Sequence, residues 1–323
     1  EAFELKICDV QELLGVRREV KDDGKGNIEM NITQPGFIQN TYDEHKGACE
    51  ALFKKPQNTP YPPRESLSRS EIPEDPAEAK RMHDRNIKRG YMSMTGSILW
   101  AARQCLPEMS YGASQLCRLM STPTDKAYEH ALHMLSYMFT QKDKGLRYST
   151  KGNSQLMGCY DSSFKPDPKD SKCQWGYVFY FKGAPIAWAS KKHDHVALSS
   201  SHAEYMALAH TARTAVWLRN LFHEMNLDEF IQGPTILLGD NINAGILCTE
   251  AKVSTQNRHI LLAYHYAKEA YETGEIEPRR VDTKSNPSDV LTKANPKPDI
   301  DRLVPCLTGW GGSPPIPPPK GRE

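Results

Sequence analysis

Apolar residues recur at helical spacing in the middle of the first half of the chain. Three such stripes fall between residues 77 and 147. The first two end before Pro107 and Pro123, and Thr124 or Asp125 is a candidate cap for the third. The pattern therefore predicts three helices. Their apolar positions include Tyr91, Met94, Ile98 and Ala101, then Leu116, Leu119 and Met120, then Tyr128, Ala131, Leu132, Leu135 and Met138.

From residue 153 the pattern changes to short apolar runs that are rich in aromatic and β-branched residues. Helical stripes interrupt these runs, so the order is strand, strand, strand, helix, strand, helix, helix, strand, helix. This order predicts an α/β fold, a mixed five-stranded sheet with helices on its faces. The predicted strands cover residues 156–160, 175–181, 185–190, 235–238 and 275–281, and the predicted helices begin near residues 201, 241, 257 and 288.

The remaining segments have weaker patterns. A short helical stretch is predicted from Val10 to Leu14, and a hairpin is predicted around the turn at residues 22–27. Repeated prolines fix φ and remove hydrogen-bond donors in two other segments, which predicts a linker and a proline-rich tail. The resulting division is residues 1–53, the linker 54–76, the helical segment 77–150, the sheet domain 151–295 and the tail 296–323.

Composition narrows the class of protein. With 323 residues, 38% hydrophobic residues and a mean hydropathy of −0.63, the chain is expected to be soluble, and no apolar stretch approaches the roughly 20 residues of a membrane span. No signal peptide precedes the first charged residues, and the start at Glu1 without methionine suggests a fragment or processed product. Eight cysteines without a Cys-x-x-Cys pair predict free thiols in a reducing compartment. Because the net charge is only +1, any basic surface must be local.

Four carboxylates stand where strands end or helices begin. Asp161 and Asp240 each end an apolar run, Glu204 lies in the first turn of the helix predicted from residue 201, and Asp289 lies where the last helix begins. Hard divalent cations take oxygen ligands, and a pair of them activates water and stabilises the leaving oxygen in phosphodiester cleavage. The set predicts a metal-dependent nuclease that cuts RNA.

Each of these acids also has a structural explanation, which is favoured when the acid is taken singly. Glu204 could complete a capping box with Ser201, Asp240 could cap a helix, Asp289 could interact with a helix dipole, and Asp161 could make an Asx turn. Two observations favour a shared site. Glu204 is in register with the sheet-facing stripe of its helix. Asp161 and Asp240 both end strands on the side where such sheets carry their sites.

Further motifs surround these acids: Asp161-Ser-Ser-Phe164, Gly176-Tyr-Val-Phe179, Pro185-Ile-Ala-Trp-Ala-Ser-Lys-Lys192, Ala203-Glu-Tyr205, Asp240-Asn241 and Pro287-Ser-Asp-Val-Leu-Thr-Lys293. Together they resemble the RNase H domain of copia-type LTR retrotransposon polyproteins. The resemblance continues upstream into that family's connection segment and the end of its reverse transcriptase, at Gly96-Ser-Ile-Leu-Trp100, Ser121-Thr-Pro-Thr124, Gly145-Leu-Arg-Tyr148 and Leu14-Gly-Val16.

The resemblance implies an RNase H fold and hydrolysis of the RNA strand of an RNA–DNA hybrid. It implies that Asp161, Glu204, Asp240 and Asp289 bind two Mg²⁺ ions, with Mn²⁺ as an alternative metal. The implied partners are the hybrid and the remainder of the polyprotein, with no membrane. The expected location is the cytoplasm, a virus-like particle or the nucleus.

Departures from the family pattern keep rival hypotheses open. The chain has no Tyr-x-Asp-Asp, so no complete polymerase site is present, and His202 replaces an acidic residue. At residues 261–263 two charges of the family pattern are lost, as in a degenerate copy that binds nucleic acid without cutting it. An integrase orders its acids Asp, Asp, Glu, and the early Glu204 argues against that class. No histidine lies between residues 275 and 288, where many RNase H enzymes place a mobile one.

Basic and polar side chains supply the candidate contacts to nucleic acid, although solvated surface charge is the ordinary explanation for any single one. Phosphate contacts position a duplex without reading its sequence. The first 150 residues lack acids at strand ends, so we expect them to be catalytically silent and to hold a duplex. The candidates are Ser162, Asn241, Lys191 and Lys192 in the sheet domain, and Arg103, Arg118 and Lys126 before it.

Overall fold

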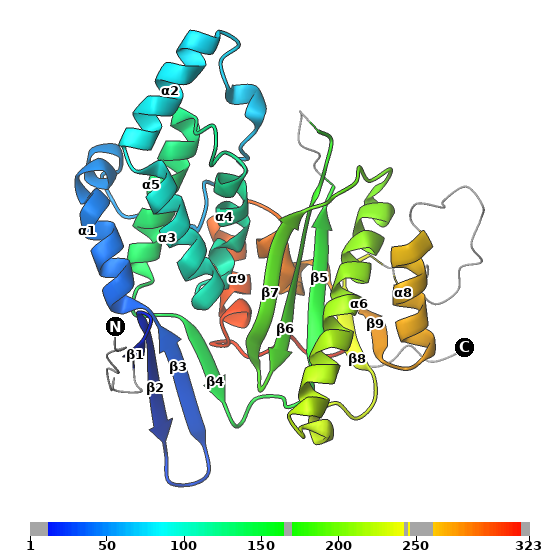
Figure 1. The fold of residues 1–323 in the computed structure, drawn as a ribbon. Helices are drawn as coiled ribbons and strands as arrows, with labels where there is room; N and C mark the ends of the chain where they lie inside the picture. The colour runs from blue at the N-terminus through cyan, green and yellow to red at the C-terminus, as the bar shows by residue number, and fades with distance from the viewer. Residues whose placement is uncertain (1–11, 165–169, 242–244, 246–260, 318–323) are drawn as a thin grey trace, which may run out of the picture.

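The computed structural model describes residues 12–164, 170–241, 245 and 261–317. Figure 1 shows a group of helices with a small sheet below it, set beside a larger sheet that carries long helices. The small sheet has the order β1-β2-β3-β4 and is antiparallel throughout. Its strands are β1 (Glu12–Leu13), β2 (Val16–Asp22), β3 (Ile28–Thr33) and β4 (Leu146–Ser149).

The predicted hairpin is confirmed as β2 and β3, which pair from Arg17↔Thr33 to Asp22↔Ile28. The predicted helical stretch from Val10 to Leu14 is wrong in its described part, because Glu12 and Leu13 form β1. Pairing with β2 overrides the weak helical pattern there, and Val10 lies outside the described residues.

The helical region contains five α-helices among its described residues. The three predicted helices are confirmed as α3, α4 and α5, and the Thr124 hydroxyl caps α5 by accepting the N–H of Ala127 at 3.1 Å. The sequence pattern missed α1 and also α2, in which only Met82 and Asn86 are buried. The bounds are α1 (Pro35–Leu52), α2 (Pro76–Lys88), α3 (Tyr91–Gln104), α4 (Ser110–Cys117) and α5 (Asp125–Thr140).

The predicted linker has no helix or strand apart from the 3₁₀ turn η1 (Arg69–Glu71), in agreement with its prolines. It is nevertheless packed. Tyr61 is buried, its ring meets Tyr111 and His130 edge-on at centroid distances of 5.3 and 5.0 Å, and its hydroxyl lies 2.9 Å from Nδ1 of His130. The segment therefore packs in a fixed position against the helices although it lacks regular secondary structure. We call it the strap.

The larger sheet has the order β7-β6-β5-β8-β9. β5 pairs antiparallel with β6 and parallel with β8, β6 pairs antiparallel with β7, and β8 pairs parallel with β9. This is the predicted RNase H-like α/β fold with a mixed five-stranded sheet. The strands are β5 (Met157–Ser163), β6 (Gln174–Phe181), β7 (Ala184–Lys192), β8 (Thr235–Gly239) and β9 (Ile276–Arg280).

Two apolar cores lie on opposite faces of this sheet. On one face α6 (Ser200–Glu224) and α8 (Leu261–Glu272) cover the strands, as Figure 1 shows. On the other face lie the 3₁₀ helix η6 (Pro287–Leu291) and α9 (Lys297–Leu307). The helix predicted from residue 241 lies outside the described residues except at residue 245. Within the described residues, no helix is both long and apolar enough to span a membrane.

Helix α9 occupies most of the first half of the segment predicted as a tail from residue 296. Its buried side chains Ile300, Leu303 and Leu307 recur at helical spacing and pack against the sheet. Pro298 stands in the first turn, where a proline is compatible with a helix because its missing N–H has no partner there anyway. Pro298 therefore lies at the start of a helix and Pro305 within it, and the prediction of residues 296–323 as one proline-rich tail missed α9.

Two glycines permit close approach near the end of β5. A Cβ on Gly239 would lie 2.3 Å from the ring of Tyr160, and a Cβ on Gly176 would lie 2.6 Å from Cβ of Leu291. Gly176 is paired with Asp161 across the sheet. The absence of a side chain there lets η6 lie directly on the strands next to Asp161.

Hydrogen bonds join the helical region to the larger sheet domain. The indole Nε1 of Trp188 donates to the carbonyl of Ala102 at 2.9 Å, and the hydroxyl of Tyr148 donates to the carbonyl of Pro185 at 2.7 Å. Near the end of η6, the N–H of Arg64 in the strap donates to the carbonyl of Ala294 at 2.8 Å. The two halves are therefore in direct contact along β7 and beside η6.

Candidate functional site

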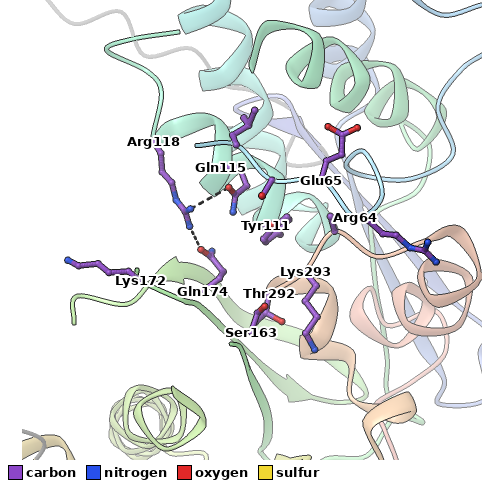
Figure 2. Close-up of a pocket in the computed structure, with 13 residues that line it drawn as sticks. Arg64, Glu65, Tyr111, Gln115, Arg118, Ser163, Lys172, Gln174, Thr292 and Lys293 are labelled. Atoms are coloured by element: carbon purple, nitrogen blue, oxygen red, sulfur yellow. Dashed lines mark hydrogen bonds between the residues drawn. The ribbon is translucent and has the colours of Figure 1, made fainter. Parts of the chain in front are cut away.

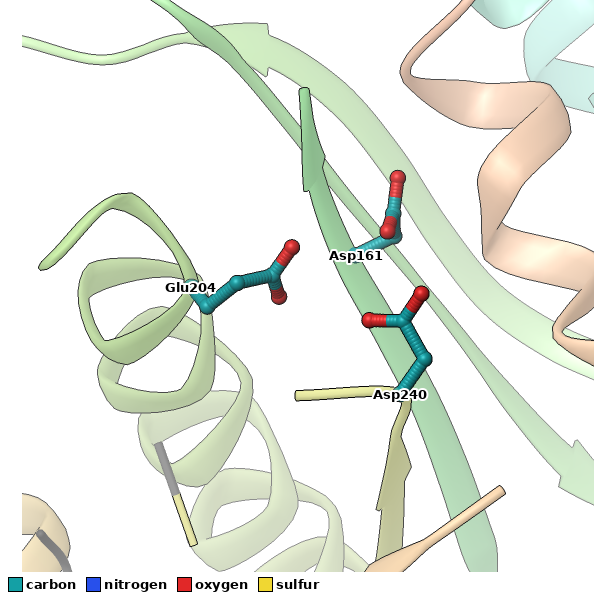
Figure 3. Close-up of side chains that lie close together, drawn as sticks. All are labelled: Asp161, Glu204 and Asp240. Carbon is teal, nitrogen blue, oxygen red and sulfur yellow. The ribbon is translucent and has the colours of Figure 1, made fainter. Parts of the chain in front are cut away.

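Three of the four predicted carboxylates converge. Asp161 lies in β5, Asp240 directly follows β8, and the pairing of Cys159 with Leu238 places the ends of these two strands side by side. Glu204 reaches them from α6 across the sheet face, as Figure 3 shows. One carboxylate oxygen from each residue lies within 4.8 Å of the others. Asp161 and Glu204 are only 1% and 5% exposed, and Asp240 is half-buried.

Glu204 reaches the cluster because of where α6 begins. The N-cap is Ser199, whose hydroxyl accepts the N–H of His202 at 3.1 Å, so a capping box between Ser201 and Glu204 does not exist. Glu204 Oε1 instead accepts the backbone N–H of Ser162 at 3.0 Å, and Oε2 has no hydrogen-bond partner among the described residues. A buried carboxylate oxygen without a partner is costly unless another group, such as a cation, satisfies it.

Burial and mutual repulsion disfavour the charged forms of these acids. Burial raises the pKa of Glu204, and the negative charges of Asp161 and Asp240 raise it further. Burial also raises the pKa of Asp161, an effect that the ammonium group of Lys293 opposes. Lys293 therefore offsets only part of the negative charge of the cluster, and a cation among the three carboxylates would relieve the remaining repulsion.

Asp289 lies beside this cluster and is not part of it. Its Oδ2 accepts a hydrogen bond from Nδ2 of Asn295 at 2.6 Å, and its Oδ1 forms an ion pair with Nζ of Lys293. The same Nζ lies 3.6 Å from Oδ2 of Asp161. Lys293 follows Asp289 by four residues, and its N–H bonds to the Asp289 carbonyl, so the local turn places the ammonium over the acid. The convergence predicted for four carboxylates holds for three.

Two polar residues that sequence reasoning did not assign a role fix Asp161 and η6 in place. The Thr292 hydroxyl donates a hydrogen bond to Oδ2 of Asp161. Asn286 donates from Nδ2 to the carbonyl of Tyr160 at 2.9 Å, which ties η6 to β5. The only sequence signal was the spacing from Asp289 to Thr292 and Lys293, which indicated a family motif but not its contacts.

The predicted nucleic-acid contacts in the sheet domain differ in accessibility. The Ser162 hydroxyl is buried, donates to the carbonyl of Gln174 at 3.2 Å and lies 3.0 Å from Nε2 of His193. Its burial argues against the prediction that it contacts nucleic acid. Lys192 forms an ion pair with Asp170 at 2.6 Å. Lys191 is exposed, and Asn241 is half-buried next to the cluster. Ser162 instead supports Glu204 through its backbone N–H.

The candidates before the sheet domain differ in the same way. Arg103 is exposed on α3. The ammonium of Lys126 lies 3.4 Å from Glu65 and 3.3 Å from Glu71, so ion pairs within the protein occupy it. Arg118 is half-buried at the junction of the two halves. The sequence departs from the family pattern at residues 261–263, and the structure does not describe the side chains of these residues.

No protein-family model matches the chain. Two retrovirus-related Pol polyproteins do align with it. One is from transposon RE2 of Arabidopsis thaliana, with 30% identity over 204 residues, and the other is from transposon TNT 1-94 of Nicotiana tabacum, with 28% identity over 302 residues. These alignments cover 63% and 92% of the chain, which spans only 14% and 21% of the two relatives.

Among solved structures, RNase H1 from Halobacterium salinarum aligns with 43% of the chain and 95% of its own length. The identity is 17% and the TM-score is 0.32.

Proposed function

Because the chain is similar to retrovirus-related Pol polyproteins of transposons, we propose that it cuts the RNA strand of an RNA–DNA hybrid. In this proposal Asp161, Glu204 and Asp240 hold Mg²⁺, or Mn²⁺ in its place. The hybrid is the substrate, and the rest of the polyprotein is the physiological partner. The described cysteines are free thiols, which supports a reducing compartment such as the cytoplasm.

The convergence of three carboxylates from separate elements is the observation that carries the proposal. Structural acids are normally paired or solvated, whereas here Oε2 of Glu204 is buried and without a partner beside Asp161 and Asp240. An all-oxygen set of this kind suits Mg²⁺ or Mn²⁺ and not zinc, which favours nitrogen and sulfur. The residues present therefore fit a hard divalent cation.

When bound at such a site, a divalent cation polarises a phosphoryl oxygen and lowers the pKa of a coordinated water. The residues of the chain supply the geometry. The N–H of Ser162 holds Glu204 in place, and the Thr292 hydroxyl orients the carboxylate of Asp161. The ammonium of Lys293 neutralises charge next to Asp161.

The role of Asp289 is separate from that of the cluster. Lys293 and Asn295 contact its two carboxylate oxygens. Asp289 would have to break both contacts before it could act as a fourth ligand and bind a second ion. We propose that its first task is to keep Lys293 beside Asp161.

The rival hypothesis is a degenerate copy that binds nucleic acid without cutting it. Asp161 and Glu204 are buried with raised pKa values beside the half-buried Asp240, and such a cluster destabilises a fold that has no use for it. The ordered support from Ser162 and Thr292 favours the enzyme over this remnant.

A panel of duplexes tests the proposed specificity. In Mg²⁺ we expect the whole chain to cut the RNA strand of an end-labelled RNA–DNA hybrid and to leave a DNA duplex of the same sequence intact, because the 2′-hydroxyl distinguishes the two strands. Denaturing gels of each labelled strand provide the measurement. Equal cutting of the DNA duplex would refute hybrid specificity, and an RNA duplex serves as the control for recognition of the DNA strand.

A further inference from the structure

A cavity of about 320 Å³ lies between the helical region and the sheet domain, next to the carboxylate cluster. The strap, α4, the end of β5, the start of β6 and the segment after η6 all contribute to its wall. Figure 2 shows Ser163, Thr292 and Lys293 on the side of the sheet and Tyr111 and Gln115 on the side of the helices. Neither half of the chain forms this cavity alone.

The wall of the cavity is basic. Among the described residues it contains Arg64, Arg118, Lys172 and Lys293, of which Lys293 is already paired with Asp289, and a single acid, Glu65. The carboxylate of Glu65 bonds with His130 at 3.0 Å and pairs with Lys126 at 3.4 Å, so its charge is already balanced. An anion is therefore the ligand that this lining favours.

The cavity lies next to the carboxylate cluster. Thr292 and Lys293 line it and at the same time contact Asp161, and Ser163 follows Asp161 by two residues on β5. A nucleic-acid strand that places one phosphodiester at Asp161 would carry its neighbouring phosphates along this surface. Phosphates of the backbone are the anions that arrive at this position in the proposed reaction.

Two of the basic residues are anchored, Arg118 through its side chain and Arg64 through its backbone. Arg118 bonds to Gln174 and to Gln115, which joins the helical region to β6 across the cavity. Arg64 has a left-handed backbone with φ of 63°, uncommon for a residue other than glycine, and its N–H is anchored on the carbonyl of Ala294. The guanidinium group of Arg118, held in this way, loses little conformational entropy when a ligand binds.

We infer that this cavity binds a backbone phosphate next to the scissile one, so that the helical region forms part of the nuclease substrate site. This inference rests on the proposed function for the identity of its ligand. It assigns the first half of the chain a defined contact, made by Arg64 and Arg118, to which Lys172 of the sheet domain adds. Lys126, whose ion pairs are internal, has no part in it.

Hybrid binding by the whole chain tests the inference without relying on cleavage. Fluorescence anisotropy in EDTA, repeated from low to moderate salt, gives the Kd and its salt dependence. The double variant Arg64→Gln/Lys172→Gln leaves the Arg118 junction intact. We expect its Kd to rise about tenfold at 0.1 M salt, and the slope of log K against log salt to fall by about 0.9, the loss of one phosphate contact.

Lys25→Gln is the matched control, because this exposed lysine lies on the turn between β2 and β3. It should keep the wild-type Kd and slope. Wild-type Kd and slope in the double variant would overturn the inference, even if the wild-type chain cuts RNA. Conversely, a wild-type chain that never cuts RNA, with weakened binding in the double variant, would refute the proposed activity and leave the phosphate site standing.

Discussion

Asp240→Asn is expected to reduce cleavage of the RNA strand by at least about 100-fold, since even residues that only support metal ligands typically contribute 10- to 100-fold. The metal-free variant should be as stable as the wild type or more stable. Removal of one negative charge relieves the repulsion that raises the pKa values of Glu204 and Asp161. Cleavage rates in Mg²⁺ and thermal unfolding in EDTA are the two measurements.

A capping aspartate provides the contrast for this variant. Asp75 is the N-cap of α2 and accepts the N–H groups of Ala77 and Glu78 at 3.3 and 3.1 Å. Asp75→Ala should lose about 1 kcal/mol of stability and keep its cleavage rate. If Asp240→Asn lowers the stability and retains the activity in the same way, Asp240 is a helix cap and its assignment as a metal ligand is wrong.

Glu108→Gln is expected to make the stability of the protein much less dependent on pH. Glu108 lies in the 3₁₀ helix η2 (Pro107–Met109), is 3% exposed, and accepts a hydrogen bond from the Tyr137 hydroxyl at 3.3 Å. Burial raises its pKa from 4.5 to about 7. Between these values the folded state holds a proton that the unfolded state has lost, so the free energy of unfolding falls as the pH rises.

Glutamine imitates the protonated form of Glu108. The variant should match the wild type near pH 4.5 and exceed its free energy of unfolding by about 3 kcal/mol at pH 8, because the pKa of Glu108 is raised from 4.5 to about 7 in the folded protein. Urea unfolding at the two pH values measures this. Tyr137→Phe removes the donor that favours the charged form, so it should cost more stability at pH 8 than at pH 4.5. A stability difference for Glu108→Gln that is the same at both pH values would contradict the account.

The larger sheet could be predicted from sequence because its strands are apolar, short and bounded by turns, and their order left few arrangements. The same patterns failed where tertiary contacts decide the structure. Helix α2 buries only Met82 and Asn86 and is mostly polar, so its sequence has no continuous apolar stripe. The strap around Tyr61 was predicted as a linker because proline content indicates the absence of regular structure and says nothing of packing.

The candidate site was predictable to the extent that strand ends and helix faces determine position. Asp161 and Asp240 follow neighbouring strands, and the stripe on α6 indicated that Glu204 faces the sheet. Spacing could not reveal that Lys293 would take Asp289 into an ion pair, because that depends on a local turn. The cavity beside the cluster was beyond prediction as well, since its wall comes from segments more than 200 residues apart in sequence, from Arg64 to Lys293.

Dependence of RNA cleavage on a divalent cation tests the central claim most directly. The whole chain is incubated with an RNA–DNA hybrid that carries a label on each strand, first in EDTA and then with excess Mg²⁺ in the same tube. We predict no cleavage in EDTA and cutting of the RNA strand alone once Mg²⁺ is added. Equal cleavage in EDTA, or an intact RNA strand at every concentration of Mg²⁺ and Mn²⁺ despite binding of the hybrid, would contradict it.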